Sequence, residues 1–192
     1  SGCIETGAFG KEAYVLTGYL NVPKIFELVL NNGEDPISGR KVGLWTGDPC
    51  EFRNFDELYE AFVKQLNYIV DLKIKINNII ERMYATYAPA PFLSVVIADC
   101  ISNGKDYYDG GPRYNTNYIQ CCGIGTVTDS LSAIKKHVFE DGAVTMEQLL
   151  KALKTNFENE EALRLRLFNK TPFFGNDDDF DLQIVFREII TL

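Results

Sequence analysis

One run of apolar residues at helical spacing, between Asn54 and Pro89, constrains the fold of this chain more than any other feature. Asn54 precedes Glu57 by three residues, a pairing that resembles the capping box of a helix start. Apolar residues then recur every three or four positions, which predicts a single amphipathic helix over about 55–86. Pro89 and Pro91 end the pattern, because proline removes a helical hydrogen bond. The apolar positions are Phe55, Leu58, Phe62, Leu66, Ile69, Ile76, Ile80 and Met83.

A shorter helix and an irregular segment precede the long helix. The pattern of residues 21–33 predicts a helix that is capped by Asn21, tolerates Pro23 in its first turn and stops at Gly33. Residues 34–52 carry three glycines and two prolines, which predicts a connection with at most a short hairpin. The buried face of this first helix is expected to carry Ile25, Leu28 and Val29.

A strand, a turn and a helix are expected in the middle of the chain. The stretch YNTNYIQCC at 114–122 favours a short strand, and the glycines at 123 and 125 favour a turn. The turn leads into a helix that we expect to be capped by Thr128 or Asp129. Cys121 and Cys122 are adjacent, so in a strand they would point to opposite faces.

Further helices complete the predicted pattern. Residues 91–105 fit either a buried helix or a buried strand, and the Asn-Gly stop at 103–104 favours the helix. Thr145 with Gln148 opens another helix, and residues 160–169 and 179–190 favour two more. Helices separated by short strands indicate a mixed α/β architecture in which the strands are enclosed.

The composition is that of an acidic globular protein. The chain has 192 residues, 46% of them hydrophobic and 24% charged, with a net charge of −8. This length and hydrophobic content indicate one domain, or a piece of a larger one, and exclude a disordered segment. Nucleic-acid binding depends on clustered lysine and arginine, and no basic run is present. We therefore expect no nucleic-acid partner.

The apolar segments and the cysteines bear on the compartment. No apolar stretch reaches the roughly 18 residues that span a bilayer, and the chain does not open with a signal peptide pattern. An odd number of cysteines without small-domain spacing favours reduced thiols over a disulfide framework. We therefore expect a soluble, cytoplasmic protein with no membrane association. The five cysteines are at 3, 50, 100, 121 and 122.

Several familiar site patterns fail on spacing. The turn at 122–130, CGIGTVTDS, lacks the third glycine of a dinucleotide fingerprint and the lysine of a P-loop, so a plain tight turn is favoured. The acidic run from Asp177 to Glu188 has Leu182 where a calcium loop requires glycine. The cysteines form no Cys-x-x-Cys pair, and we interpret the single histidine, His137, as an ordinary surface residue. No metal site is predicted.

Cys3 and Glu5 form the remaining candidate constellation. In an extended segment residues i and i+2 project to the same side about 6 to 7 Å apart, so the sulfur and the carboxylate could address neighbouring atoms of one small substrate. Gly2 and Gly7 flank the pair and permit a close approach of substrate to the backbone. A Cys/His hydrolase that pairs Cys3 with His137 is an alternative, but no pattern brings these two residues together.

Three stretches taken in order give these residues a family context. GCIETGAFGKEAYVLTGY, GPRYNTNYIQCCGIGTVTDSLSAIKKHVF and NKTPFFGNDDDF resemble the barrel domain of the glycyl radical enzymes, the pyruvate formate-lyase-like superfamily. The resemblance implies part of a ten-stranded α/β barrel wrapped by helices. Residues 1–192 would form the carboxy-terminal part of this barrel domain and begin at the catalytic cysteine loop, with the glycyl radical domain absent.

The resemblance also implies a chemistry. Cys3 would become a thiyl radical and abstract a hydrogen atom from substrate carbon, since S–H and activated C–H bonds are of comparable strength. Glu5 would hand a proton to a departing hydroxyl, with its pKa raised in a buried pocket. Tyr19 is a candidate for lining the substrate pocket, although a packed aromatic is an equally good interpretation. The implied reaction is loss of water from trans-4-hydroxy-L-proline to give 1-pyrroline-5-carboxylate.

The family pattern implies partners that lie outside the chain. The radical glycine of the family lies in an Arg-Val-x-Gly-Tyr type of motif, which this sequence lacks, so we expect the isolated chain to be inactive. No cofactor would be bound directly, because an S-adenosylmethionine and iron-sulfur activating enzyme installs the radical under anaerobic conditions. The full-length protein is expected to be a homodimer. The alternatives are a glycyl radical lyase or decarboxylase acting on a diol, choline, isethionate or arylacetate, and a non-catalytic stand-alone domain.

Overall fold

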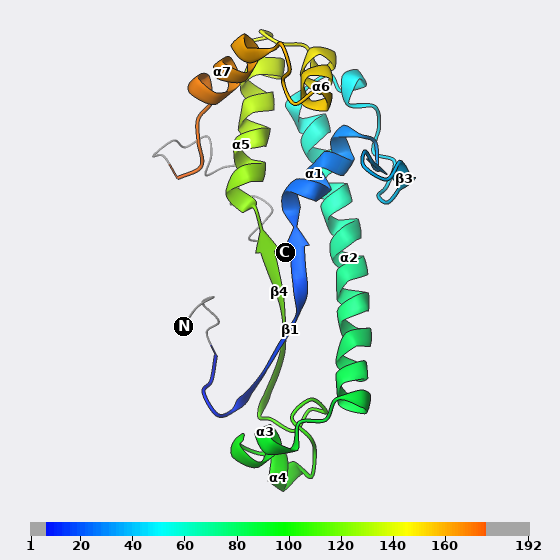
Figure 1. The fold of residues 1–192 in the computed structure, drawn as a ribbon, viewed down its shortest axis with the longest axis vertical. Helices are drawn as coiled ribbons and strands as arrows, with labels where there is room; N and C mark the ends of the chain where they lie inside the picture. The colour runs from blue at the N-terminus through cyan, green and yellow to red at the C-terminus, as the bar shows by residue number, and fades with distance from the viewer. Residues whose placement is uncertain (1–6, 176–192) are drawn as a thin grey trace. The chain divides into compact units, whose positions relative to one another are not determined.

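The computed structural model describes residues 7–175, and these fall into two compact units (Figure 1). The first, the strand unit, combines the residues up to Leu20 with Val70–Gln120. The second, the helical unit, combines Asn21–Ile69 with the residues from Cys121 onward. Helices and strands occur together, as the predicted mixed α/β class requires, and the described residues do not form a closed barrel.

Two long strands form the centre of the strand unit. Strand β1, Glu12–Asn21, pairs with β4, Tyr114–Cys122, and both run in the same direction (Figure 1). The Tyr114 N–H donates to the carbonyl of Lys11 at 3.0 Å, where the pairing begins. β4 covers the predicted residues, whereas β1 was not predicted. Much of β4 is exposed, so the expected enclosure of the strands by helices is not met within residues 7–175.

One face of β1 packs against a small apolar cluster of the strand unit. Ala13 and Val15 are buried there, and Tyr107 is the third buried member. The Tyr107 hydroxyl accepts a hydrogen bond from the Tyr14 N–H at 2.7 Å, which ties the loop before β4 to the strand. Partly buried residues complete this cluster: Ala90, Ile97 and Tyr108.

Helix α1, Val22–Leu30, confirms the capping signals of its sequence. The Asn21 side chain accepts a hydrogen bond from the Lys24 N–H at 3.2 Å, as an N-cap residue should. The helix ends before Gly33, whose φ of 83° lies in the left-handed region and whose N–H reaches back to the carbonyl of Leu28. Residues predicted to be buried are buried: Ile25, Leu28 and Val29.

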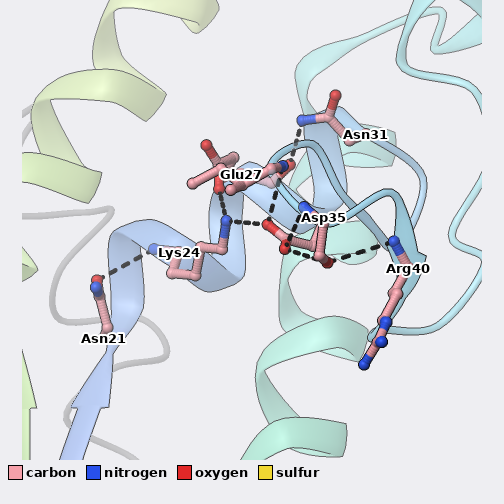
Figure 2. Close-up of polar contacts among 8 residues, drawn as sticks. Asn21, Lys24, Glu27, Asn31, Asp35 and Arg40 are labelled. Atoms are coloured by element: carbon pink, nitrogen blue, oxygen red, sulfur yellow. Dashed lines mark hydrogen bonds and ion pairs between the residues drawn. The ribbon is translucent and has the colours of Figure 1, made fainter.

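Ionic contacts connect α1 to the hairpin that follows it (Figure 2). Strands β2, Glu34–Asp35, and β3, Arg40–Lys41, pair antiparallel and confirm the predicted short hairpin. The Lys24 ammonium contacts the carboxylate of Glu27 and lies 2.6 Å from that of Asp35. The Lys24 hydrogen bond holds the pKa of Asp35 well below its usual range. These contacts fix the hairpin against the first turns of α1.

Helix α2, Phe55–Tyr87, confirms the long helix of the sequence pattern. The Asn54 side chain accepts from the Glu57 N–H at 3.0 Å, while the Glu57 carboxylate binds Arg53, so only half of the predicted capping box forms. A short 3-10 turn, η1 (Pro49–Glu51), precedes it. No helix in the described part of the chain is both long and apolar enough to cross a bilayer.

Helices α3, Pro91–Val96, and α4, Cys100–Asn103, replace the single buried helix expected over 91–105. Asp99 separates them because its φ of 76° breaks the helical path. The helical interpretation was right and the expected burial was wrong, since among their residues only Cys100 is buried. Large side chains left exposed there are Phe92, Leu93, Val95, Val96 and Ile101.

Helix α5, Ile124–Ile134, begins earlier than predicted. Its N-cap is Gly123, with a φ of 80°, and not Thr128 or Asp129. Thr128 lies within the helix, where its hydroxyl donates to the carbonyl of Ile124 at 2.9 Å. The glycine-rich segment is therefore the turn that joins β4 to α5, as the sequence indicated.

The prediction that His137 is a surface residue was wrong. α5 continues into a π-helical turn, η2 (Lys135–Glu140), whose i to i+5 bonding changes the angular phase of the side chains. His137 is 1% exposed, and its Nε2 lies 3.1 Å from the Thr171 hydroxyl. Burial lowers the pKa of this imidazole, as do the charges of Arg166 and Lys136, against the opposing effect of Asp141.

The last described helices agree with their sequence signals. α6, Met146–Lys154, starts with the predicted capping box, in which Thr145 and Gln148 exchange side-chain to backbone hydrogen bonds. α7, Glu161–Lys170, corresponds to the helix predicted over 160–169. The helix predicted over 179–190 and the acidic run from Asp177 to Glu188 lie outside the described residues.

Candidate functional site

The predicted catalytic pair, Cys3 and Glu5, lies outside the described residues, so their roles stay predictions. The structure describes the chain from Gly7 onward, which is two residues beyond Glu5. The site can therefore be built from its carboxy-terminal base, where residues 7–11 lead into β1.

Glu12, the first residue of β1, is the centre of this base. Its side chain is 7% exposed, and one carboxylate oxygen, Oε2, accepts the Ala8 N–H at 2.7 Å. The other oxygen, Oε1, accepts the Thr116 hydroxyl at 2.6 Å and the Tyr118 hydroxyl at 3.0 Å. The carboxylate thus joins the segment before β1 to two side chains of β4.

The aromatic side chain of Tyr14 packs against the same segment. A Cβ added at Gly7 would overlap the Tyr14 hydroxyl and would lie 2.5 Å from an oxygen of Glu12, so a larger residue would have to displace these side chains. The Tyr14 ring stacks on that of Tyr118 with centroids 5.9 Å apart and an interplanar angle of 7°. Glu12, Tyr14 and the β4 residues therefore form one polar and aromatic face, which we call the loop-base face.

The electrostatics of the loop-base face favour an ionised Glu12 carboxylate beside a neutral Tyr14 phenol. The Thr116 hydroxyl, the Ala8 N–H and the Tyr118 hydroxyl all donate to Glu12 and lower its pKa. Burial raises the pKa of Tyr14, and the negative charge of Glu12 raises it further. A fixed anion therefore lies at the carboxy-terminal end of the predicted catalytic loop.

Tyr19, the predicted pocket residue, lies in β1 and is 59% exposed. Ala13 and Val15 point to the side of the Tyr107 cluster, and a Cβ at Gly18 would lie 2.6 Å from the Lys73 ammonium of α2. Gly18 has a φ of 139°, which favours glycine at this position. Since neighbouring side chains in a strand point to opposite faces, Tyr19 points away from Lys73.

Sequence reasoning missed β1 and with it Glu12. A usable signal exists, because the stretch EAYVLTGYLN is rich in aromatic and β-branched residues, which favour strands. Thr116 and Tyr118 fall on one face of the predicted strand by their spacing of two, but no local pattern brings them to Glu12. Contacts over more than a hundred positions depend on the strand pairing.

Neither a metal centre nor a disulfide is found in the part of the chain that the structure describes. Over residues 7–175, no group of three or more histidine, cysteine or acidic side chains could hold a metal ion. The described cysteines form no disulfide, and burial raises the pKa of Cys100 and Cys121. These thiols are therefore held in the protonated form.

The parallel pair of β1 and β4, whose connection along the chain is largely helical, is the arrangement of an α/β protein (Figure 1). The chain belongs to the pyruvate formate lyase-like family, whose model matches residues 1–188. The resemblance found in the sequence is thereby confirmed.

Individual members of the family differ in how similar they are to this chain. The chain is 57% identical over 185 residues to trans-4-hydroxy-L-proline dehydratase of Clostridioides difficile, covering 96% of this chain and 23% of the relative. It is 34% identical to (2S)-3-sulfopropanediol dehydratase of Klebsiella oxytoca, covering 93% of this chain and 22% of the relative. The crystal structure of the Clostridioides difficile hydroxyproline dehydratase with trans-4-hydroxy-L-proline bound superposes with a TM-score of 0.91, covering 95% of this chain and 23% of that chain. The chain thus spans less than a quarter of the length of these relatives.

Proposed function

We propose that the full-length protein carrying this sequence is a glycyl radical dehydratase that removes water from trans-4-hydroxy-L-proline. The observation that carries the proposal is the gap between 57% identity to the hydroxyproline dehydratase and 34% identity to the sulfopropanediol dehydratase, over nearly the same residues. The whole described fold agrees with that relative, with a TM-score of 0.91. The product is 1-pyrroline-5-carboxylate.

Cys3 and Glu5 carry the chemistry in this proposal. The glycyl radical supplies the unpaired electron. The Cys3 thiyl takes a hydrogen atom from a substrate carbon, which forms an S–H bond and leaves a carbon radical. Glu5 then gives a proton to the departing hydroxyl, so that the C–O bond breaks and water leaves, and the ring nitrogen loses a proton that restores the acid form of Glu5. Return of one hydrogen atom from the Cys3 thiol to the product radical restores the thiyl.

Tyr19 is proposed as a residue of the substrate pocket. Its side chain points away from Lys73, because Gly18 beside it faces that residue. It lies on the same strand as Glu12 and Tyr14, the residues at the base of the catalytic loop. An exposed phenol on this face is suited to contact a polar substrate.

The remaining features of the proposal concern the whole protein. We place residues 1–192 in the carboxy-terminal part of the barrel domain, with the radical glycine outside them. A radical S-adenosylmethionine activating enzyme with an iron-sulfur cluster is the proposed partner, and a homodimer is the proposed assembly. Cys50 and Cys121, which form no disulfide, fit a reducing, anaerobic cytoplasm.

The first experiment tests the two catalytic residues in the full-length protein. We expect the activated protein to give a glycyl radical doublet by electron paramagnetic resonance and to form 1-pyrroline-5-carboxylate from trans-4-hydroxy-L-proline. Cys3→Ser and Glu5→Gln should keep the doublet and lose turnover by at least about 1,000-fold, within the range that removal of a catalytic group causes. The matched controls are Cys50→Ser and Glu60→Gln, which alter exposed residues of the same types and should keep full activity.

A second candidate function is another lyase of the same superfamily. The 34% identity to a sulfopropanediol dehydratase supports this alternative. A glycyl radical doublet without turnover of hydroxyproline would favour it, and small diols and sulfonates would then be assayed. A full-length coding sequence without a glycyl radical motif would instead favour a non-catalytic domain.

A further inference from the structure

We propose that Glu12 is a positioning residue that fixes the carboxy-terminal end of the catalytic loop against β4. This inference deepens the proposed function and rests on it, since it requires that Cys3 and Glu5 act on substrate. Glu12 itself would not touch the substrate or the reacting atoms.

Glu12 contacts the carboxy-terminal end of the catalytic loop. The Ala8 N–H donates to Glu12 Oε2 at 2.7 Å, and Ala8 is three residues from Glu5 and five from Cys3. A charge-assisted hydrogen bond to a backbone N–H is both stronger and more directional than a neutral one. It restrains the main chain at the point where the loop rejoins the fold.

Glu12 also contacts β4. The other oxygen of the same carboxylate, Oε1, accepts the hydroxyls of Thr116 and Tyr118, at 2.6 and 3.0 Å. These side chains lie 104 and 106 residues away in the sequence, so the contact joins segments that only the fold brings together. Because β4 is the paired strand of the unit, it supplies a fixed reference for the loop.

The Glu12 carboxylate suits these contacts as a hydrogen-bond acceptor. All three partners of Glu12 are donors, and an ionised carboxylate is the side chain that accepts several hydrogen bonds at once. Glu12 is 7% exposed, whereas Thr116 is exposed and can bond to water instead, so removal of the carboxylate would chiefly deprive the half-buried Ala8 N–H of its acceptor. The loop end would then lose its restraint. Displacement of a reacting group by about 1 Å can cost about 100-fold in rate.

Glutamine offers a conservative rescue at this position. The amide oxygen of Glu12→Gln can still accept the Ala8 N–H, and the amide NH₂ can donate to the two hydroxyl oxygens. Thr116 can accept such a bond because its hydroxyl oxygen also lies 3.1 Å from the carbonyl of Ala13, to which it can donate. Alanine retains none of these contacts.

The test compares Glu12→Ala and Glu12→Gln in the activated full-length protein. For Glu12→Ala we expect kcat to fall about 10- to 100-fold, with KM within threefold of the wild type and an unchanged glycyl radical doublet. For Glu12→Gln we expect kcat within about threefold of the wild type. Glu60→Ala is the matched control, because it removes an exposed carboxylate from α2 and should change neither constant.

Each outcome separates the inference from the proposed function. Wild-type kcat in Glu12→Ala, with Cys3→Ser inactive, would overturn the positioning role and leave the dehydratase in place. A loss of radical yield and thermal stability in proportion to the loss of activity would also overturn it, because that result describes a purely structural residue. No turnover by the wild type, despite a clear doublet, would instead contradict the proposed substrate and so the basis of the inference.

Discussion

The helical unit and the strand unit bury their side chains by different means. In the helical unit, α2 contributes Leu58, Phe62 and Leu66, which are at most 2% exposed. In the strand unit, the same helix contributes Ile76 and Met83, which are 50% and 53% exposed. The sequence pattern of α2 is equally apolar in both units, so the difference lies in what packs against it.

The comparison shows how each unit is held together. Aromatic side chains from α1 and η2 contact the first half of α2: the Phe26 and Phe62 rings meet edge to face at 5.7 Å, and Phe139 contacts Phe55 at 6.5 Å. The strand unit instead depends on a small apolar cluster and on the hydrogen bonds of Glu12. Its exposed apolar side chains form the kind of surface that marks an interaction with further protein.

The largest expected effect comes from truncating one residue in each half of α2. We expect Leu66→Ala to cost about 2–5 kcal/mol in local stability, because it leaves a cavity in a packed core. Ile76→Ala should cost at least about 1 kcal/mol less, because half of that side chain is already exposed. Hydrogen exchange of α2 peptides in the full-length protein measures both values. Equal costs would show that, in the full-length protein, the second half of α2 is packed as tightly as the first half.

A pair of glycines sharpens the same comparison. Gly33 in the helical unit and Gly104 in the strand unit both have positive φ, at 83° and 59°. An added Cβ would overlap the backbone carbonyl of Leu44 at Gly33, but would meet nothing within 4 Å at Gly104.

We therefore expect Gly104→Ala to cost about 1–2 kcal/mol from φ alone and Gly33→Ala to cost about 2–4 kcal/mol. Thermal unfolding of the full-length variants, with hydrogen exchange to localise the change, measures the two costs. If Gly104→Ala cost as much as Gly33→Ala or more, a Cβ at Gly104 would have to meet other atoms in the full-length protein. The strand unit would then be packed more closely there than residues 7–175 alone show.

Local signals in the sequence predicted the helices, and long-range contacts account for what it missed. Asn21 and Thr145 cap the helices that they were expected to cap, because these hydrogen bonds form within four residues. His137 was misjudged because the π-helical turn changes the direction in which its side chain points. Glu12 was missed because its partners on β4 are more than a hundred residues away. Cys3 and Glu5 were singled out by their spacing and flanking glycines, and the roles that the family resemblance implies for them stay predictions.

Lowering the pH is expected to destabilise the two units over different pH ranges, and this is the smallest of the predicted effects. Each holds a buried titratable side chain whose pKa is lowered, His137 in the helical unit and Glu12 in the strand unit. For His137 the unfolded state binds more protons below its usual pKa of 6.5, so the stability of the helical unit falls as the pH drops from about 6.5 towards the lowered value. For Glu12 the stabilisation is complete above the usual pKa of 4.5 and is lost as the pH falls through the lowered value.

Between pH 6.5 and 5, therefore, the helical unit should lose protection from hydrogen exchange while the strand unit keeps it, after correction for the intrinsic exchange rate. His137→Gln should abolish this loss, because the amide can retain the contact with Thr171 without titrating. The Glu12→Gln variant should leave it unchanged. No group specific to the strand unit is expected to titrate between pH 6.5 and 5. A uniform loss of protection in both units over this range, or a loss that persists in His137→Gln, would therefore show that acid destabilises the two units together.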